Sequence, residues 1–246
     1  MAPSLTLHIL PPSHPSMTAA AALELKGLEF EKVSLPMPHN DEMERLYGPG
    51  NRTVPGLTID GAERVHGSIA ILERLEQLVP EPPLYPEPIA DAVREADRWG
   101  DKELQDLGRR LPWGALHFRP EAVGTFAEPY DPLDPAGTDF AIRFTRAMWK
   151  YHRITAAGLA EDLAGLPAKI DHIDELAREG IVGGESPTAA DLQIGATVRV
   201  LLTVGDLRRL IEGRPAEEIA RRWFPDYAGE VPAGAFPAGW VPPREG

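Results

Sequence analysis

The spacing of apolar residues changes near residue 80, from short strand-like runs before it to helical spacing after it. Leu5–Leu10 and the alternating segment Glu29–Leu35 predict two strands, and Pro15–Lys26 predicts a helix between them. Gly27 stands where the C-terminal cap of that helix belongs. The chain therefore begins with the order β-α-β.

Two further apolar runs, Leu57–Ile59 and Arg64–Val65, flank Asp60-Gly61. This pair predicts a hairpin, because a type I′ turn needs positive φ at its centre. Ser68 then predicts the N-terminal cap of a helix that runs to Leu78. After a connecting segment the order is thus β-β-α, and the whole is the thioredoxin-like arrangement.

The rest of the chain predicts an all-helical domain. Apolar residues recur at three- and four-residue spacing in segments 89–111, 140–163, 166–179 and 188–202. The Pro- and aromatic-rich segment 110–139 interrupts them and predicts a long loop that shapes substrate access or a dimer contact.

A run of prolines at 80–88 cannot continue a helix and marks a boundary. We therefore expect an α+β thioredoxin-like domain at 1–80, a linker at 81–88 and an all-α helical bundle domain at 89–246. The tail at 224–246 combines many prolines and glycines with aromatic residues, so it is expected to be irregular and packed by these aromatic anchors. Disorder is the alternative for the tail.

Composition and charge narrow the classes of function. The 246 residues are 43% hydrophobic, and 25 Lys and Arg against 38 Asp and Glu give a net charge of −13. Such a charge argues against nucleic acid or a membrane surface as a partner. The absence of cysteine excludes disulfide scaffolds, thiolate metal sites and cysteine nucleophiles.

No apolar run approaches the roughly 18 residues of a membrane-spanning helix. Prolines interrupt the apolar start of the chain and no Lys or Arg precedes Lys26, so a secretory signal is not expected and the cytoplasm is the default location. The histidines show no spacing with acidic residues that defines a metal site.

The turn after the first strand is where thiol chemistry sits in the thioredoxin-like arrangement, and here it carries Ser13 and Ser16. A helix N-terminus stabilises an anion such as a thiolate, and a serine hydroxyl can donate one further hydrogen bond to it. The alternative is that both serines only cap the helix. His14 could act as a base or cationic partner, or be an exposed loop residue.

Two more segments could bind a ligand. A cis bond between Val54 and Pro55 would leave the backbone N–H and C=O of Val54 free to pair with an extended peptide ligand, the alternative being the plain end of a loop. Ser68 opens a helix, where its hydroxyl and N–H could bind a carboxylate, and its alternative is an ordinary cap.

Three segments in this order and spacing, 22–31, 54–71 and 186–192, resemble the glutathione S-transferase family. In the last of them Thr188 would cap the buried helix of the family's C-terminal domain, and Asp191 would bond back to it. The resemblance covers nearly the whole first domain and one helix of the second.

The resemblance implies roles for individual residues. Ser13 would activate the sulfur of glutathione, Val54 would pair with the cysteinyl part beside a cis Pro55, and Ser68 would receive the γ-glutamyl carboxylate. Ser16 occupies the second cysteine position of redox-active relatives, so a dithiol mechanism is excluded. The family usually has Glu or Gln before Ser68, but this chain has Gly67.

The resemblance also implies a reaction. The expected protein is a homodimeric enzyme that adds a thiol, with glutathione as co-substrate and no metal, to an electrophilic small molecule. The pocket for that molecule would lie between the domains, with His14, Trp99 and Trp113 as candidate lining residues. The alternative for the two tryptophans is that they belong to the hydrophobic core. The alternatives are a non-catalytic ligand-binding or protein-interaction member of the same fold, and a thiol-dependent lyase, isomerase or dehalogenase.

Overall fold

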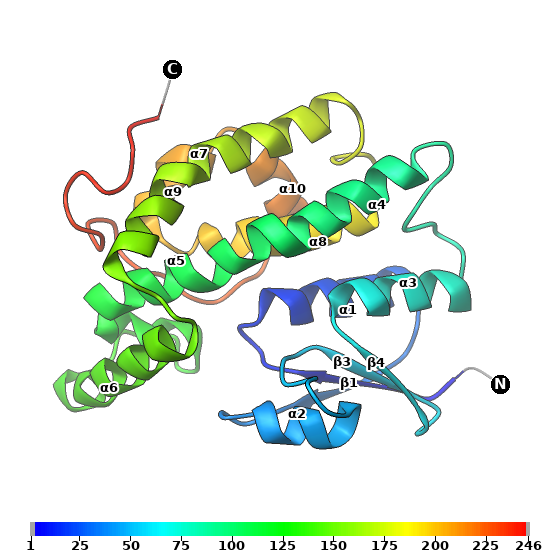
Figure 1. The fold of residues 1–246 in the computed structure, drawn as a ribbon, viewed down its shortest axis with the longest axis horizontal. Helices are drawn as coiled ribbons and strands as arrows, with labels where there is room; N and C mark the ends of the chain where they lie inside the picture. Colours follow the sequence, from blue (N-terminus) through cyan, green and yellow to red (C-terminus); the bar gives the residue numbers. More distant parts are fainter. Residues whose placement is uncertain (1–2, 245–246) are drawn as a thin grey trace.

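A computed structural model describes residues 3–244, and a mixed sheet of four strands organises its first part (Figure 1). The strands lie in the order β2-β1-β3-β4. Strand β1 (Leu5–Ile9) runs parallel to β2 (Glu31–Ser34) and antiparallel to β3 (Gly56–Ile59), and β4 (Glu63–His66) runs antiparallel to β3. This arrangement confirms the predicted thioredoxin-like fold.

Helices cover both faces of the sheet. Figure 1 shows α1 (His14–Leu25) and α3 (Ser68–Leu78) on the face towards the helical domain and α2 (Asn40–Tyr47) on the other. Apolar side chains of the strands and of α1 and α3 fill the first interface. A smaller apolar cluster lies under α2, in the segment that the sequence predicted only as a connection.

The hairpin between β3 and β4 confirms the turn signal. Asp60 and Gly61 have φ values of 50° and 69°, as the Asp-Gly pair predicted. The start of α3 differs from the expectation, because Gly67 occupies the capping position with φ 90° and Ser68 is the first helical residue. The prediction that Ser68 caps this helix is therefore wrong.

The second part of the chain is helical. Its elements are α4 (Ala90–Trp99), a π-helical turn (Gly100–Leu104), α5 (Gln105–Phe118), a 3₁₀ helix (Pro120–Phe126), α6 (Pro135–Tyr151), α7 (Ala156–Arg178), α8 (Ala189–Leu201), α9 (Gly205–Ile211) and α10 (Pro215–Trp223). Helix α8 lies at the centre, and every residue in it except Arg199 is buried. The predicted capping box of Thr188 and Asp191 opens this helix.

Two helix boundaries differ from the sequence prediction. Helix α6 ends at Tyr151 and α7 runs unbroken through Pro167, so the predicted helices 140–163 and 166–179 are wrong. Leu163 and Leu166 are fully buried on the same side of α7 as Ile170. Their burial holds the helix together across Pro167, although a proline removes one backbone hydrogen bond.

The predicted long loop at 110–139 is also largely helical. Helix α5 continues to Phe118, the 3₁₀ helix follows it, and α6 begins at Pro135 with Asp134 as its cap. The side chain of Asp134 accepts from the amide of Gly137 at 2.7 Å. Local hydrogen bonds of this kind let a segment with many prolines form short helices.

The proline-rich segment between α3 and α4 is fixed against the first domain. The buried side chain of Lys26 donates to Glu76 at 2.5 Å and to the carbonyl oxygen of Pro82 at 2.7 Å. The two parts of the chain also bond directly, since the hydroxyl of Thr18 in α1 donates to the carbonyl oxygen of Leu192 in α8 at 3.2 Å.

Candidate active site

The topology of the sheet brings three predicted segments to one edge. Strand β1 ends close to Ser13, and His8 near that end pairs with Gly56 at the start of β3. Gly56 also pairs with His66 at the end of β4. The β1–α1 turn, Val54-Pro55 and Ser68 therefore lie at the same edge, and Figure 1 shows that edge facing α5 and α6.

Ser13 occupies the capping position of α1 but does not cap the helix. Its backbone is extended, with φ −85° and ψ 114°, and its hydroxyl makes no capping hydrogen bond. Its amide donates to the carbonyl oxygen of Leu10 at 2.9 Å. The first turn of α1 holds no acidic side chain, so the positive end of the helix dipole is uncompensated there. Among residues 3–244 the hydroxyl has no hydrogen-bond partner, and it lies at a site that favours an anion.

His14 is buried rather than exposed, which contradicts its interpretation as a loop residue. It is 4% exposed, and a Cβ built on Gly108 of α5 would lie 3.1 Å from its Nε2. Burial, and secondly the charge of Arg109, lower the pKa of His14 to about 3. The imidazole is therefore neutral near pH 7 and cannot serve as a cationic partner for a thiolate.

Ser16 lies on the same buried side of α1. It is 3% exposed, and its hydroxyl has no hydrogen-bond partner among the residues that the structure describes. Ser13 and Ser16 therefore differ in access, although the sequence gives them the same residue type one helical turn apart.

The peptide bond between Val54 and Pro55 is cis, as expected. Within residues 3–244, the N–H and C=O of Val54 make no backbone hydrogen bond, so both remain free to pair with a ligand. The flanking atoms are held, because His66 Nε2 donates to the carbonyl oxygen of Thr53 at 2.8 Å and the amide of Gly67 donates to that of Pro55 at 3.0 Å.

Ser68 lies beside this strand end. The residue is 4% exposed, and no described residue forms a hydrogen bond with its hydroxyl. A Cβ built on the neighbouring Gly67 would meet no heavy atom within 4 Å. The space that a longer side chain would occupy before Ser68 is therefore open.

Tyr47 of α2 supports this edge from the other face of the sheet. A Cβ on Gly56 would lie 2.3 Å from the Tyr47 ring, so the ring packs directly on the glycine. The Tyr47 hydroxyl lies 2.7 Å from His8 Nδ1 and 3.3 Å from the Thr58 hydroxyl. Burial raises the pKa of Tyr47 and lowers that of His8. No sequence pattern indicated this packing, because it depends on α2.

The end of helix α6 contacts the start of α2 on the same side of the molecule. Asn40 Nδ2 donates to the Tyr151 hydroxyl and to the carbonyl oxygen of Arg52, both at 2.7 Å. Of the candidate pocket residues, Trp113 faces α6, with its ring centroid 5.5 Å from that of Phe144. Trp99 packs on α7, 4.5 Å from the ring of His172.

The tail reaches the site through Tyr227, whose hydroxyl donates to the carbonyl oxygen of Pro12 at 2.7 Å. Sequence patterns did not identify this contact, which joins residues 215 positions apart. Phe224 and Phe236, two of the expected anchors, are 5% and 7% exposed.

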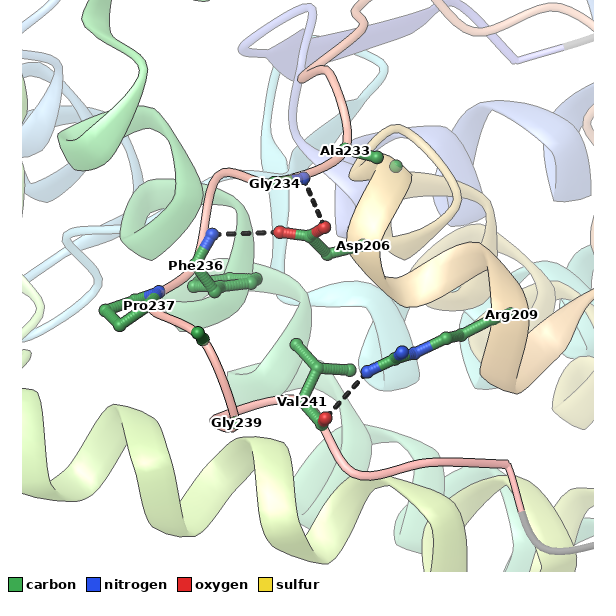
Figure 2. A pocket seen from close by; sticks show the side chains of 10 residues that line it. Asp206, Arg209, Ala233, Gly234, Phe236, Pro237, Gly239 and Val241 are labelled. Carbon is green, nitrogen blue, oxygen red and sulfur yellow. Dashed lines mark hydrogen bonds between the residues drawn. The ribbon is translucent and has the colours of Figure 1, made fainter.

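A cavity of about 590 Å³ lies away from Ser13, between α9 and the tail (Figure 2). Figure 2 shows the Asp206 carboxylate accepting from the amides of Gly234 and Phe236, at 2.5 and 2.8 Å, and Arg209 donating to the carbonyl oxygen of Val241 at 2.6 Å. The charged side chains of this cavity are thus engaged in holding the tail.

Between residues 3 and 244, no three His, Cys, Asp or Glu side chains group in a way that could hold a metal ion. In the same part of the chain, no helix is both long and apolar enough to cross a membrane.

Comparison with known proteins identifies the first domain. Residues 7–83 match the family model for the N-terminal domain of glutathione S-transferase. The resemblance inferred from the sequence is therefore confirmed. None of the curated proteins matches the chain.

Solved structures show that the fold of both parts is that of glutathione S-transferases. A β-etherase from Sphingobium sp. strain SYK-6 is 22% identical over 79% of this chain and 82% of its own, with a TM-score of 0.57. A glutathione S-transferase from Rhodospirillum rubrum is 20% identical over 89% and 85%, with a TM-score of 0.55. A maleylacetoacetate isomerase from Anaeromyxobacter dehalogenans, which holds dicarboxyethyl glutathione, is 21% identical over 90% and 86%, with a TM-score of 0.50.

Proposed function

We propose that this chain, whose residues 7–83 match a glutathione S-transferase N-terminal domain, adds the thiol of glutathione to an electrophilic small molecule. Ser13 stabilises the thiolate, the backbone of Val54 beside cis Pro55 pairs with the cysteinyl part, and Ser68 receives the γ-glutamyl carboxylate. The proposal includes a cytoplasmic homodimer. The observation that carries it is the uncommitted Ser13 hydroxyl at the N-terminus of α1.

The energetics of thiolate stabilisation are sufficient without a buried base. Lowering a thiol pKa of about 8.5 by about two units requires roughly 2.7 kcal/mol of preferential stabilisation of the thiolate. A hydrogen bond from the Ser13 hydroxyl to an anion contributes about 1.5–3 kcal/mol, and the helix N-terminus adds up to about 1 kcal/mol. Neutral His14 adds no charge to this sum.

In this mechanism Ser13 acts on the nucleophile. The thiol of bound glutathione loses its proton to solvent, the Ser13 hydroxyl donates to the resulting thiolate, and the sulfur attacks the electrophilic carbon. With an aryl halide the new C–S bond replaces the carbon–halogen bond and halide leaves. With an epoxide the C–O bond of the ring breaks and the oxygen takes a proton from solvent. The net charge of −13 does not attract an anionic tripeptide over long distances. Affinity must therefore come from short-range contacts at Val54, Ser68 and the start of α1.

Gly67 favours a second candidate, a non-catalytic member of the same fold that binds a ligand or a protein. Glu or Gln at this position would add a side-chain contact at the γ-glutamyl end, and glycine provides none. A thiol-dependent lyase or isomerase is a third candidate, supported by a β-etherase and a maleylacetoacetate isomerase among the structures with this fold.

Calorimetric titration with glutathione separates the first two candidates. Binding at millimolar concentration or below, with turnover of a generic aryl halide or epoxide, supports the transferase. No heat of binding at millimolar glutathione contradicts it and leaves the non-catalytic member. Glutathione binding with release of a cleaved or isomerised product, but no conjugate, supports the third candidate.

A further inference from the structure

The peptide group between Pro12 and Ser13 is held at both of its polar ends. Its N–H, which belongs to Ser13, donates to the carbonyl oxygen of Leu10 at 2.9 Å. Its C=O, which belongs to Pro12, accepts from the Tyr227 hydroxyl at 2.7 Å. Fixing both ends of a planar peptide group fixes its rotation. Together with the φ of Ser13, which is −85°, the orientation of this plane sets the direction in which the Cα–Cβ bond of Ser13 points.

Tyr227 is itself anchored on its N-terminal side by Arg199 of α8. The Arg199 guanidinium donates to the carbonyl oxygens of Phe224 and Pro225 at 2.9 and 3.3 Å. It also lies 5.8 Å from the centre of the Tyr227 ring. The anchor therefore belongs to the buried central helix, and the tail cannot shift here without breaking these contacts.

The tail is fixed again just after Tyr227. Gly229 has φ 115°, and a Cβ there would lie 2.2 Å from the ring of Phe126. Glu230 exchanges two hydrogen bonds with the Thr125 hydroxyl, at 2.8 and 3.1 Å. Tyr227 is thus placed by contacts on both sides of it along the chain.

We propose that Tyr227 is a positioning residue for Ser13, acting through the carbonyl group of Pro12 to hold the Ser13 hydroxyl in the direction of the bound sulfur. This inference rests on the proposed role of Ser13. It makes the C-terminal tail a part of the thiol site, although the tail lies more than 200 positions away along the chain. Burial raises the pKa of Tyr227, so the hydroxyl stays protonated and remains a donor.

The variant Tyr227→Phe removes the hydroxyl and keeps the ring on its anchor. Tyr130→Phe is the matched control, because Tyr130 is 54% exposed and its hydroxyl has no partner among the described residues. Gly229→Ala should weaken the same contact between Tyr227 and the Pro12 carbonyl, since its methyl group displaces the tail from Phe126.

Hydrogen exchange of the 10–17 segment tests the contact without any ligand. Faster exchange of the Ser13 amide in Tyr227→Phe and Gly229→Ala, with Tyr130→Phe at the wild-type rate, is the expected result. Exchange at the wild-type rate in Tyr227→Phe overturns the proposal, because the Pro12 carbonyl then does not depend on the tail.

The pKa of the bound glutathione thiol tests the consequence. We expect Tyr227→Phe to raise it by about half a unit to one unit and to lower kcat/KM about three- to tenfold, mainly through kcat. The Kd of S-methylglutathione, which forms no thiolate, should stay within about twofold of the wild type. A wild-type thiol pKa in Tyr227→Phe overturns the inference. If the wild-type protein does not ionise glutathione, the proposed function is contradicted instead. The hydrogen-exchange result then still shows whether Tyr227 holds the Pro12 carbonyl.

Discussion

The amide of Gly67 donates a 3.0 Å hydrogen bond to the carbonyl oxygen of Pro55. The bond joins the residue after Val54 to the residue before Ser68, so it fixes the distance between two proposed glutathione contacts before any ligand arrives. Gly67 makes this bond with φ 90°, in the region that favours glycine. The same residue thus organises the site through its backbone and leaves open space where a side chain could stand.

Gly67→Gln tests whether that open space limits affinity. We expect the Kd for glutathione to fall about three- to tenfold, because one added side-chain hydrogen bond contributes about 0.5–1.5 kcal/mol. Positive φ in a non-glycine residue should lower the free energy of unfolding by about 1–2 kcal/mol. Calorimetry and urea unfolding measure the two effects separately.

Gly61→Gln is the control for backbone strain. Gly61 has φ 69° and open space around its Cβ, but it lies in the hairpin turn at the other end of β3. It should lose similar stability with an unchanged Kd. Equal affinity of Gly67→Gln and the wild type for glutathione would show that the γ-glutamyl end does not lie beside Gly67.

Asp97 of α4 gives a pH dependence to stability. The carboxyl is 1% exposed and accepts from the Tyr85 hydroxyl at 3.0 Å, and burial raises its pKa from 3.8 to about 7. The folded state therefore keeps the proton that the unfolded chain releases between about pH 4 and pH 7. The contribution of Asp97 to the free energy of unfolding is therefore lost as pH rises through that window, by about 4 kcal/mol at most.

Asp97→Asn removes the titration and keeps an oxygen acceptor for Tyr85. The difference in unfolding free energy between this variant and the wild type should grow in favour of the variant from pH 4 to pH 7 and level off above it. Urea unfolding across this range measures the difference. A difference that does not change with pH would mean that the Asp97 carboxyl titrates alike in both states.

The capping box of α8 should contribute more to stability than the exposed cap of α6. The fully buried Asp191 accepts from the amides of Gly183 and Thr188 at 2.6 and 2.9 Å. Asp191→Ala leaves both amides without a partner and should lower the free energy of unfolding by about 2–4 kcal/mol. Asp134→Ala, at the exposed cap of α6, should cost about 1 kcal/mol. Equal losses in urea unfolding would contradict the account.

Signals carried by neighbouring residues were sufficient for much of the fold. The Asp60-Gly61 turn and the capping box at Thr188 each depend on a few adjacent side chains, and both are present. Helix α2 was missed because it has only eight residues, of which Met43, Leu46 and Tyr47 are apolar. Apolar spacing over about two turns is too short a pattern to predict a helix.

The candidate site also combines features that could be expected from the sequence with features that only the folded structure shows. The turn that holds Ser13 was located from local sequence, whereas the cis bond before Pro55 was implied only by the family resemblance, and both are present in the structure. The burial of His14 depends on Gly108 in α5, and the position of the Pro12 carbonyl depends on Tyr227. Such contacts between distant segments leave no periodic pattern, so only the folded structure could reveal them.

Ser13 is proposed to stabilise the thiolate of bound glutathione, so the pKa of that thiol should depend on the Ser13 hydroxyl. Ser16→Ala is the control, because it removes a buried hydroxyl with no partner one helical turn away. We predict a thiol pKa roughly two units below the free value of about 8.5 in the wild type and in Ser16→Ala. In Ser13→Ala we predict a rise of about one to two units and a rate lower by about ten- to 150-fold. A wild-type thiol pKa in Ser13→Ala would contradict the account.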